Sequence, residues 1–320
     1  MSKLTTVGDP HVKNKNLEQT DELFNFIETQ GNDVLITGDV FDTKEVIRGK
    51  CLNFVYNRIL NSKLHYTILV GNHDYFNLEC EDHALQVFKD LPNVTIVDEV
   101  IEMSPNIYAI PYVHDLDKLK AMLAEIPEGA VLFGHLDVVT FDYGNGYLSE
   151  AGLLLEDLKK FKKVISGHYH KYQEKGNLTY IGTPFSHSFG ESNQEKYIGV
   201  FDSQTNNLEL IKTPFPQHLT IDVNCDDYVN NNVRVDVAPS INHTRIILNG
   251  TSENIMKYRA NIPLPDNSKI IERPTDEFMN GVSIDETADN LVKFKEWATE
   301  IKGLDPDTLH LGVQILEALK

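Results

Sequence analysis

The feature that most constrains this 320-residue chain is an apolar run that ends in a glycine and is followed at once by polar side chains. Residues 66–70 are the clearest case, because their β-branched and apolar types predict a buried strand. Gly71 breaks that strand, and Asn72, His73 and Asp74 follow directly. Ligands of α/β sheets bind at the carboxyl ends of strands, so this turn is a candidate reactive edge. Taken alone, it could equally be a turn that caps the next helix.

The same pattern recurs after other apolar runs of the chain. These runs end in Gly8-Asp9-Pro10-His11, Gly38-Asp39-Val40-Phe41-Asp42, Gly134-His135 and Gly167-His168-Tyr169-His170. Glycine lets the backbone turn sharply, so the next side chain can point into a shared crevice. Any single cluster has an ordinary explanation as a turn carboxylate or a helix cap. Their repetition at successive strand ends favours one common site.

The N-terminal runs alternate with stretches of helical periodicity. Strands are predicted at residues 4–7, 34–37 and 66–70, with one helix before the second strand and another over residues 44–60. This order of strand, helix and strand predicts parallel strands whose carboxyl ends lie at one edge.

Later segments predict a second sheet. Further strands are predicted at residues 94–97, 107–110, 130–133 and 163–166, and further helices over 80–91, 115–126 and 153–161. Strand then follows strand at residues 179–181, 197–201 and 208–212, which indicates a second sheet packed against the first. The predicted fold class is α/β with α+β elements, a two-sheet β-sandwich flanked by helices.

The segment Pro214-Phe215-Pro216 marks a predicted domain boundary. Residues 1–213 form the first predicted domain, and residues 214–274 a small α+β capping domain with strands at 219–223, 233–237, 245–248 and 269–272 and a helix over 253–260. Residues 275–320 are predicted to be a linker and a pair of C-terminal helices. Those helices either bind a partner or pack on their own domain.

Composition limits the class of protein. A hydrophobic content of 41% predicts a globular core, and no apolar stretch has the length of a membrane span. The chain begins without an apolar signal region, and its three cysteines have no paired spacing, so we expect a reducing cytoplasm. The net charge of −19 argues against a general nucleic-acid coat protein. It does not exclude an enzyme that meets nucleic acid through bound metal ions.

The residue types in the clusters indicate a metal pair. Carboxylates, imidazoles and one carboxamide, without cysteine, suit manganese, iron or zinc better than calcium or a structural zinc site. A bridging aspartate is needed to hold two cations about 3.5–4 Å apart. Asp39 follows a predicted central strand and is the natural bridge. Such a pair polarises a phosphate and lowers the pKa of a shared water, which predicts phosphoester hydrolysis.

Taken in order, these motifs resemble the signature of the calcineurin-like metallophosphoesterases over about two thirds of the chain. The resemblance implies a first metal held by Asp9, His11, Asp39 and His170. It implies a second metal held by Asp39, Asn72, His135 and His168. His73 would then lie over the phosphate as a catalytic group oriented by Asp42, and Asp74 would be a turn or helix-capping carboxylate.

One branch of that family fits better than another. Thr43 and Asp74 stand where the protein serine/threonine phosphatases carry arginine and glutamate. The segment 180–191, with Ser188-Phe189-Gly190-Glu191, and the following Lys196 are similar to the SbcD-type nuclease subunits of double-strand-break repair. The chain resembles their compact bacteriophage recombination-endonuclease versions. This implies DNA as substrate, an SbcC-type coiled-coil ATPase partner bound by the C-terminal helices, and a homodimer formed through helices at 44–60 and 80–91.

The hypothesis from sequence is a hydrolase: a two-metal DNA nuclease, with exonuclease and single-strand endonuclease activity, that acts beside the ATPase in DNA recombination and repair. Manganese is the favoured ion, with magnesium, iron and zinc left open, and no membrane is involved. For a phage protein the compartment is the cytoplasm of the bacterial host. One alternative is an enzyme for cyclic nucleotides or nucleotide pyrophosphates. Another is a non-catalytic scaffold for the ATPase. His187 lies outside the motifs, in a segment expected near the site.

Overall fold

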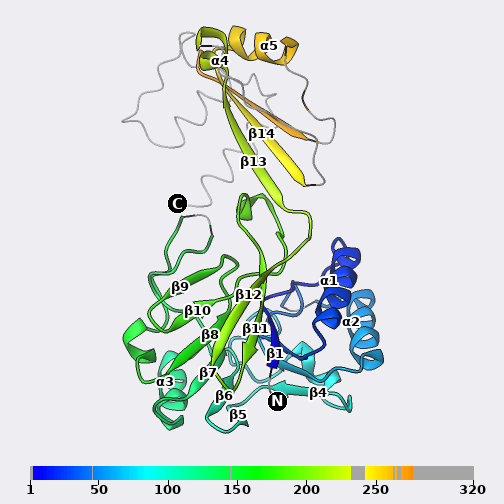
Figure 1. Ribbon diagram of the computed structural model, residues 1–320, viewed down its shortest axis with the longest axis vertical. Helices are drawn as coiled ribbons and strands as arrows, with labels where there is room; N and C mark the ends of the chain where they lie inside the picture. The colour runs from blue at the N-terminus through cyan, green and yellow to red at the C-terminus, as the bar shows by residue number, and fades with distance from the viewer. Residues whose placement is uncertain are drawn as a thin grey trace, which may run out of the picture. The chain divides into compact units, whose positions relative to one another are not determined.

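A computed structural model describes residues 3–44, 46–144, 146–231, 242–261, 264 and 268–276. The chain forms two compact units, and the first comprises Met1–Leu219 with Ile241–His243. The elements of each unit are labelled in Figure 1. The predicted strand at 233–237 and the predicted C-terminal helix pair lie outside the described residues. In the part that is described, no helix has both the length and the apolar character needed to cross a membrane.

One sheet of the first unit contains the three N-terminal strands that the sequence predicts. Its members are β1 (Lys3–Val7), β2 (Asp33–Ile36), β3 (Tyr66–Leu69), β4 (Val94–Val97), β11 (Tyr197–Asp202) and β12 (Asn207–Lys212). They lie in the order β12-β11-β1-β2-β3-β4. Strands β1 to β4 are parallel, while β11 pairs antiparallel with both β1 and β12. The predicted parallel arrangement of the first three strands is confirmed.

The second sheet completes the predicted sandwich. Its members are β5 (Ile101–Ser104), β6 (Ile107–Ile110), β7 (Val131–His135), β8 (Lys163–Gly167), β9 (Gln173–Lys175) and β10 (Leu178–Tyr180), in the order β5-β6-β7-β8-β10-β9. The sequence assigned the strands at 179–181, 197–201 and 208–212 to this second sheet, and that prediction is wrong for the last two. Of the late run of strands, β10 alone joins it, whereas β11 and β12 return to the first sheet and cover the edge of β1. Strands β5 and β9 were not predicted, because neither has a continuous buried face.

Helices cover the sandwich. Helices α1 (Leu17–Gln30) and α2 (Gly49–Asn61) lie side by side in Figure 1, and their buried faces share one core with strands of the first sheet. Helix α3 (Leu116–Glu125) forms where the sequence predicts a helix, and it packs into a core with strands of the second sheet. The two-sheet α/β fold flanked by helices is therefore confirmed.

Two predicted helices are wrong, and the expected start of a third is too early. The segments 80–91 and 153–161 form only short 3₁₀ turns, Ala84–Phe88 and Leu155–Leu158. In each case a β-bridge, Tyr75 to His83 or Val138 to Leu153, holds the preceding residues extended. Helix α2 begins at Gly49 and not at residue 44. The homodimer was expected to form through helices at 44–60 and 80–91, and the segment 80–91 does not form the second of these helices.

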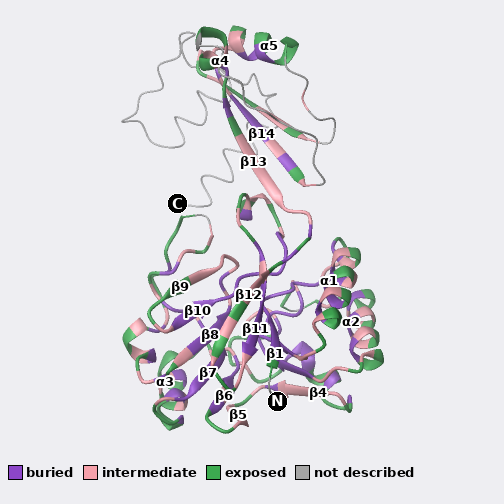
Figure 2. Cartoon of the chain, viewed as in Figure 1, coloured by how far each residue is buried: buried purple, intermediate pink, exposed green. Residues whose placement is uncertain are grey.

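The core between the sheets sets their spacing. Leu35 and Leu69 from the first sheet meet Phe133 and Ile165 from the second, and all are fully buried. The ring of Phe133 lies 5.1 Å from the ring of Phe201 in an edge-to-face contact. Strands β1, β3 and β7 are buried along nearly their whole length, and Figure 2 draws buried residues in purple. This packing fixes the carboxyl ends of both sets of parallel strands relative to each other.

Replacing Phe133 with alanine tests that packing. The side chain has no exposed surface, so we expect the free energy of unfolding to fall by about 3–5 kcal/mol, measured by denaturant titration. Phe76 is 41% exposed, and its replacement by alanine is expected to change stability by about 0.5 kcal/mol or less. Similar losses in both variants would contradict a close-packed interface between the sheets.

The second unit is a small α+β module. It contains α4 (Cys225–Asn231), α5 (Ser252–Asn261), β15 (Lys269–Pro274) and all but the first residues of β13 (His218–Asn224) and β14 (His243–Gly250), with strand order β13-β14-β15. Val223, Ile246, Leu248 and Tyr258 form its core. Helix α4 was not predicted, because its short sequence carries few apolar residues.

Candidate metal centre

The polar clusters after strands of both sheets converge on one region of the first unit. Asp9 and His11 follow β1, and the first sheet also contributes residues after β2 and β3. His135 ends β7, and His168 directly follows β8. The structure brings together every predicted ligand, namely Asp9, His11, Asp39, Asn72, His135, His168 and His170.

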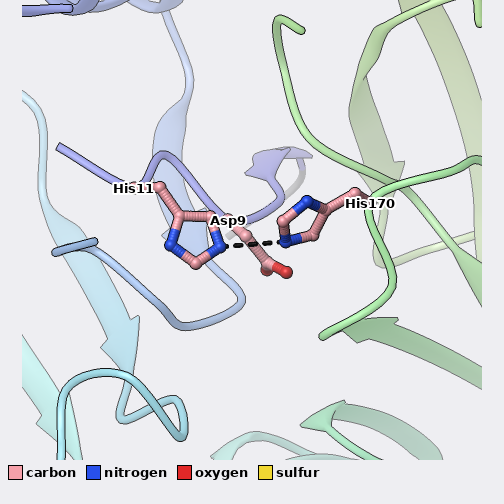
Figure 3. A group of neighbouring side chains, drawn as sticks. All are labelled: Asp9, His11 and His170. Carbon is pink, nitrogen blue, oxygen red and sulfur yellow. Dashed lines mark hydrogen bonds between the residues drawn. The ribbon is translucent and has the colours of Figure 1, made fainter. Parts of the chain in front are cut away.

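A first group consists of Asp9, His11 and His170, whose ligand atoms lie within 4.8 Å of one another. The Nε2 atoms of the two histidines face each other at 3.0 Å, as Figure 3 shows. The Oδ1 atom of Asp9 is buried and has no hydrogen-bond partner among the described residues. An orphaned oxygen on a carboxylate that is grouped with two imidazole nitrogens fits a bound cation, since buried polar atoms normally have partners.

A second group surrounds the Nε2 atom of His135. This nitrogen lies 2.8 Å from Oδ1 of Asn72 and 3.3 Å from Nδ1 of His168. The Asn72 oxygen is in turn 2.9 Å from the same His168 nitrogen. Three potential ligand atoms therefore converge, and they are the neutral ligand types that divalent transition metals accept.

Asp39 belongs to both groups. Its Oδ2 atom lies 3.7 Å from Nε2 of His11 and 3.5 Å from Nε2 of His135. Its Oδ1 atom accepts a hydrogen bond from the main-chain N–H of His73 at 2.7 Å. One oxygen facing both groups is the arrangement expected of a carboxylate that bridges two cations.

Hydrogen bonds orient the candidate histidine ligands. Nδ1 of His135 donates to the carbonyl of Thr37 at 2.8 Å, and Nδ1 of His170 donates to Oε1 of Glu191 at 2.9 Å. Both bonds leave Nε2 free to bind a metal. His168 is reversed: its Nδ1 faces Asn72, and its Nε2 lies 3.8 Å from the carboxylate of Asp137.

Glu191 is a site residue to which sequence reasoning assigned no role. Its second oxygen pairs with the almost fully buried Lys196 at 2.6 Å. Burial alone would raise the pKa of Glu191, but the hydrogen bond from His170 and the charge of Lys196 hold it well below its usual value. The signal was present in the sequence, because Glu191 and Lys196 both lie in the segment that resembles the nuclease subunits.

His187 also lies at the site, although it belongs to none of the strand-end motifs. Its ring packs 5.2 Å from that of His11 and 5.7 Å from that of His170. Its Nε2 lies 3.3 Å from the carbonyl oxygen of Asp9, to which it can donate. Burial lowers the pKa of His187 to about 3, so the ring is neutral at pH 7. This neutral ring packs against the His11 and His170 rings of the first group.

The electrostatics of the centre favour a cation. Burial lowers the pKa of His168 to about 3 and that of His11 well below its usual value, so both rings are neutral. Burial raises the pKa of Asp9 to about 6. Burial would lower the pKa of His135, but the carboxylate of Asp39 raises it to about 9. A divalent cation bound here would replace that proton and neutralise the buried carboxylates.

The backbone at the centre is held in an unusual conformation. His11, Asp39 and His168 all have positive φ angles, of 43°, 49° and 92°. Non-glycine residues adopt this region at a cost of about 1–3 kcal/mol each, and such residues cluster at functional sites. Gly71 is required for a different reason, since a Cβ atom there would lie 2.2 Å from Oδ1 of Asp39.

Asp74 ties two of the loops together. Its carboxylate accepts main-chain N–H groups from Gly71 at 3.0 Å, Phe41 at 3.2 Å and Val40 at 3.3 Å. Burial and the neighbouring Asp39 raise the pKa of Asp74 to about 7. The carboxylate thus forms the expected turn after β3, and it also fixes the loop that carries Asp39.

His73 is held by Asp42, but through a different group than a carboxylate–histidine pair would use. The Nδ1 atom of His73 donates to the main-chain carbonyl of Asp42 at 2.9 Å. The Asp42 carboxylate pairs instead with Lys13 at 2.8 Å. The His73 ring lies 4.8 Å from the ring of His11. Because Nδ1 is occupied, Nε2 is the ring atom left for a substrate.

Metal removal should destabilise the first unit, because Asp9 and Asp39 would repel each other in a buried site. An ion present at 100 times its Kd adds about 2.7 kcal/mol. At about 2–4 °C per kcal/mol for a domain of this size, we expect Mn²⁺ to raise the Tm of chelator-treated protein by roughly 5–10 °C. Differential scanning fluorimetry measures the shift, and the Asp39→Ala variant should lack it. An equal shift in that variant would place the bound ion elsewhere.

A two-sheet α/β sandwich with carboxylates, imidazoles and an amide at its strand ends defines the class of metal-dependent phosphoesterases. Residues 2–172 match the family model described as calcineurin-like phosphoesterase, and the chain belongs to that family. The membership that the motifs predict is thus confirmed.

Curated relatives include viral proteins. Exonuclease subunit 1 of Enterobacteria phage T4 is 28% identical over 217 residues, which cover 63% of each chain. A protein of Invertebrate iridescent virus 3 named as phosphoesterase 078R is 32% identical over 58% of each chain. One of Invertebrate iridescent virus 6 named as phosphoesterase 244L is 27% identical over 81% of this chain and 98% of its own length. The chain therefore spans only 63% and 58% of the length of the first two relatives.

Proposed function

We propose that this chain is a divalent-metal-dependent phosphodiesterase that cleaves DNA as the nuclease subunit of a recombination and repair complex. The observation that carries the proposal is Asp39, whose Oδ2 atom faces His11 at 3.7 Å and His135 at 3.5 Å. A buried carboxylate shared by two imidazole groups suits a pair of cations. Phosphate diesters need such charge, because their hydrolysis concentrates negative charge on oxygen.

The residues present fit the ions. Asp9, His11, Asp39 and His170 would hold one cation, and Asp39, Asn72, His135 and His168 the other. When bound, such a pair neutralises the phosphate and activates a water molecule for attack. Mn²⁺ is the ion that we favour, because the set mixes carboxylate, amide and imidazole without thiolate. Mg²⁺, Fe²⁺ and Zn²⁺ are compatible with the same ligands.

His73 is proposed as the catalytic group that is not a ligand. Its Nδ1 proton is committed to the carbonyl of Asp42, which can only accept. Its Nε2 atom is thus the one that can hold a proton near a leaving oxygen, and general acid catalysis of this kind contributes about 10²–10⁴-fold. Asp42 acts as a positioning residue through its main chain.

The substrate and partners follow from the nuclease relationship. The phage T4 relative is named as an exonuclease and as a subunit, which supports a DNA substrate and a partner chain. We propose an SbcC-type coiled-coil ATPase as that partner, with residues 275–320 as its binding segment and residues 214–274 as a capping domain. A homodimer is part of the same proposal.

A direct assay tests the proposed function. Chelator-treated protein is supplied with Mn²⁺ and mixed with labelled linear duplex DNA, single-stranded DNA or bis(p-nitrophenyl) phosphate, with and without the ATPase. We expect release of nucleotides or short fragments from DNA. Hydrolysis of the small diester or of cyclic nucleotides without DNA cleavage would overturn the nuclease assignment. ATPase binding without hydrolysis of any substrate would instead identify a scaffold.

A further inference from the structure

A cavity of about 640 Å³ opens beside the metal centre, between the loop after β1 and the start of α2. Its volume lies within the range of about 300–1,000 Å³ that is usual for ligand pockets. Its charged lining residues are Lys13, Lys15, Asp42 and Arg48.

The cavity shares walls with the centre. His187 lines it, and the His187 ring packs 5.2 Å from that of the predicted ligand His11. Asp42 also lines it, and the carbonyl of Asp42 holds the ring of His73 at 2.9 Å. A substrate whose phosphate lay at the ligand groups would therefore extend its neighbouring group into this cavity.

The charge of the lining is opposite to that of the chain. Three cationic side chains, Lys13, Lys15 and Arg48, stand against the single carboxylate of Asp42 in a protein of net charge −19. Lys13 already pairs with Asp42 at 2.8 Å. Lys15 and Arg48 are exposed, and neither has an ion-pair partner among the residues that the structure describes. Two positive charges thus remain available to an anionic ligand.

Helix α2 adds to this positive potential. The cavity is lined by Cys51 in the first turn of α2, by the N-cap residue Arg48 and by Ile47 before it, and the first turn contains no acidic residue. The amino end of a helix carries a partial positive charge, which adds to that of Arg48. The potential at the cavity therefore comes from both side chains and backbone.

Apolar side chains also line the cavity. Val12, Phe41 and Cys51 are buried there, and Ile47 is half-buried. A lining of both apolar and cationic side chains matches a nucleotide, because its base presents a flat apolar face and its phosphate carries the charge. A strand of nucleic acid would meet both features at once.

We propose that this cavity binds the nucleotide next to the scissile phosphate, with Lys15 and Arg48 contacting the phosphate of that neighbouring nucleotide. The inference rests on the proposed function, because it assumes that the substrate is a strand with more than one phosphate. It assigns to these two residues a role in binding strands and none in the chemical step. A small diester with a single phosphate reaches the ligand groups without filling the cavity.

The test compares two substrates in the Lys15→Ala/Arg48→Ala double variant of the full chain. In Mn²⁺ we expect KM for a labelled single-stranded oligonucleotide to rise about tenfold or more, and a much smaller change of KM for bis(p-nitrophenyl) phosphate. Fluorescence anisotropy of the oligonucleotide over a salt series gives a second readout. Loss of the contacts to this one phosphate should lower the slope of log K against log salt by about 0.7. Lys118→Ala/Lys159→Ala removes the same charge from exposed positions elsewhere and should match wild type.

The outcomes separate the two proposals. If wild type cleaves DNA and the double variant retains its KM and its salt slope, the assignment of the cavity is wrong and the nuclease function stands. If wild type cleaves no DNA but binds the oligonucleotide through Lys15 and Arg48, the nuclease function is wrong, and the cavity is a binding site for a nucleic-acid strand that is not cleaved. Equal weakening by the Lys118 and Lys159 control would also overturn the cavity assignment, since the effect would then be one of net charge.

Discussion

Replacing Asp39 with alanine is expected to abolish both metal binding and phosphodiester hydrolysis. One oxygen of this carboxylate faces His11 at 3.7 Å and His135 at 3.5 Å, so its removal disrupts both ligand groups. Metal ions contribute several kcal/mol of transition-state stabilisation, and kcat should therefore fall by about 10³-fold or more. Metal content by mass spectrometry should fall from two ions per chain to none.

Loss of folding must be separated from loss of metal in this experiment. Asp39→Asn keeps the shape of the side chain and should fold, yet it lacks the negative charge that offsets the repulsion between two cations. Asp90→Ala removes an exposed carboxylate and should retain full metal content and activity. A folded Asp39→Ala protein that binds two ions would contradict the bridging role.

Replacing His73 with alanine is expected to separate catalysis from metal binding. The main-chain N–H of residue 73 would still bond to Asp39, and no predicted ligand atom is lost. Two ions per chain should remain, whereas kcat should fall by about 10²–10⁴-fold, the usual contribution of a general acid or base. KM should change little, because the substrate is held by other groups.

Asp42→Ala is the matched comparison for His73. It deletes the carboxylate that pairs with Lys13 but keeps the carbonyl that orients the His73 ring at 2.9 Å. We therefore expect a much smaller loss of kcat than in His73→Ala. Equal losses of activity in the two variants would show that the carboxylate itself acts on His73, and equal losses of metal in His73→Ala and Asp39→Ala would refute the catalytic role.

The strand-end clusters could be predicted because their signal is local. A buried strand, a glycine and a polar side chain occupy a few consecutive residues, as in Gly71-Asn72-His73. Parallel strands joined by helices bring their carboxyl ends to one edge of each sheet, and the packing of the two sheets then brings the two edges together. The structure places all the predicted ligands together for this reason.

Two predicted helices do not form because contacts with residues outside each segment override its local preference for helix. Residues 80–91 and 153–161 have helical periodicity, but the bridges Tyr75–His83 and Val138–Leu153 extend the chain before each segment. Only five residues, Ala84–Phe88, then have room for a helical turn in the first case. Such bridges depend on the fold and leave no periodic signal in the sequence.

The chemistry of the centre was therefore determined by the sequence, and its orientation by the tertiary structure. The residue types and their order are fixed by the covalent chain, and from them the ligands, the family and the α/β sandwich were predicted. Which nitrogen of each imidazole faces the site depends on hydrogen bonds such as His135 to Thr37 and His170 to Glu191, whose partners lie far away in the chain. Only the folded arrangement of the two sheets brings those partners within reach. It also places the main-chain carbonyl of Asp42, and not its carboxylate, next to Nδ1 of His73.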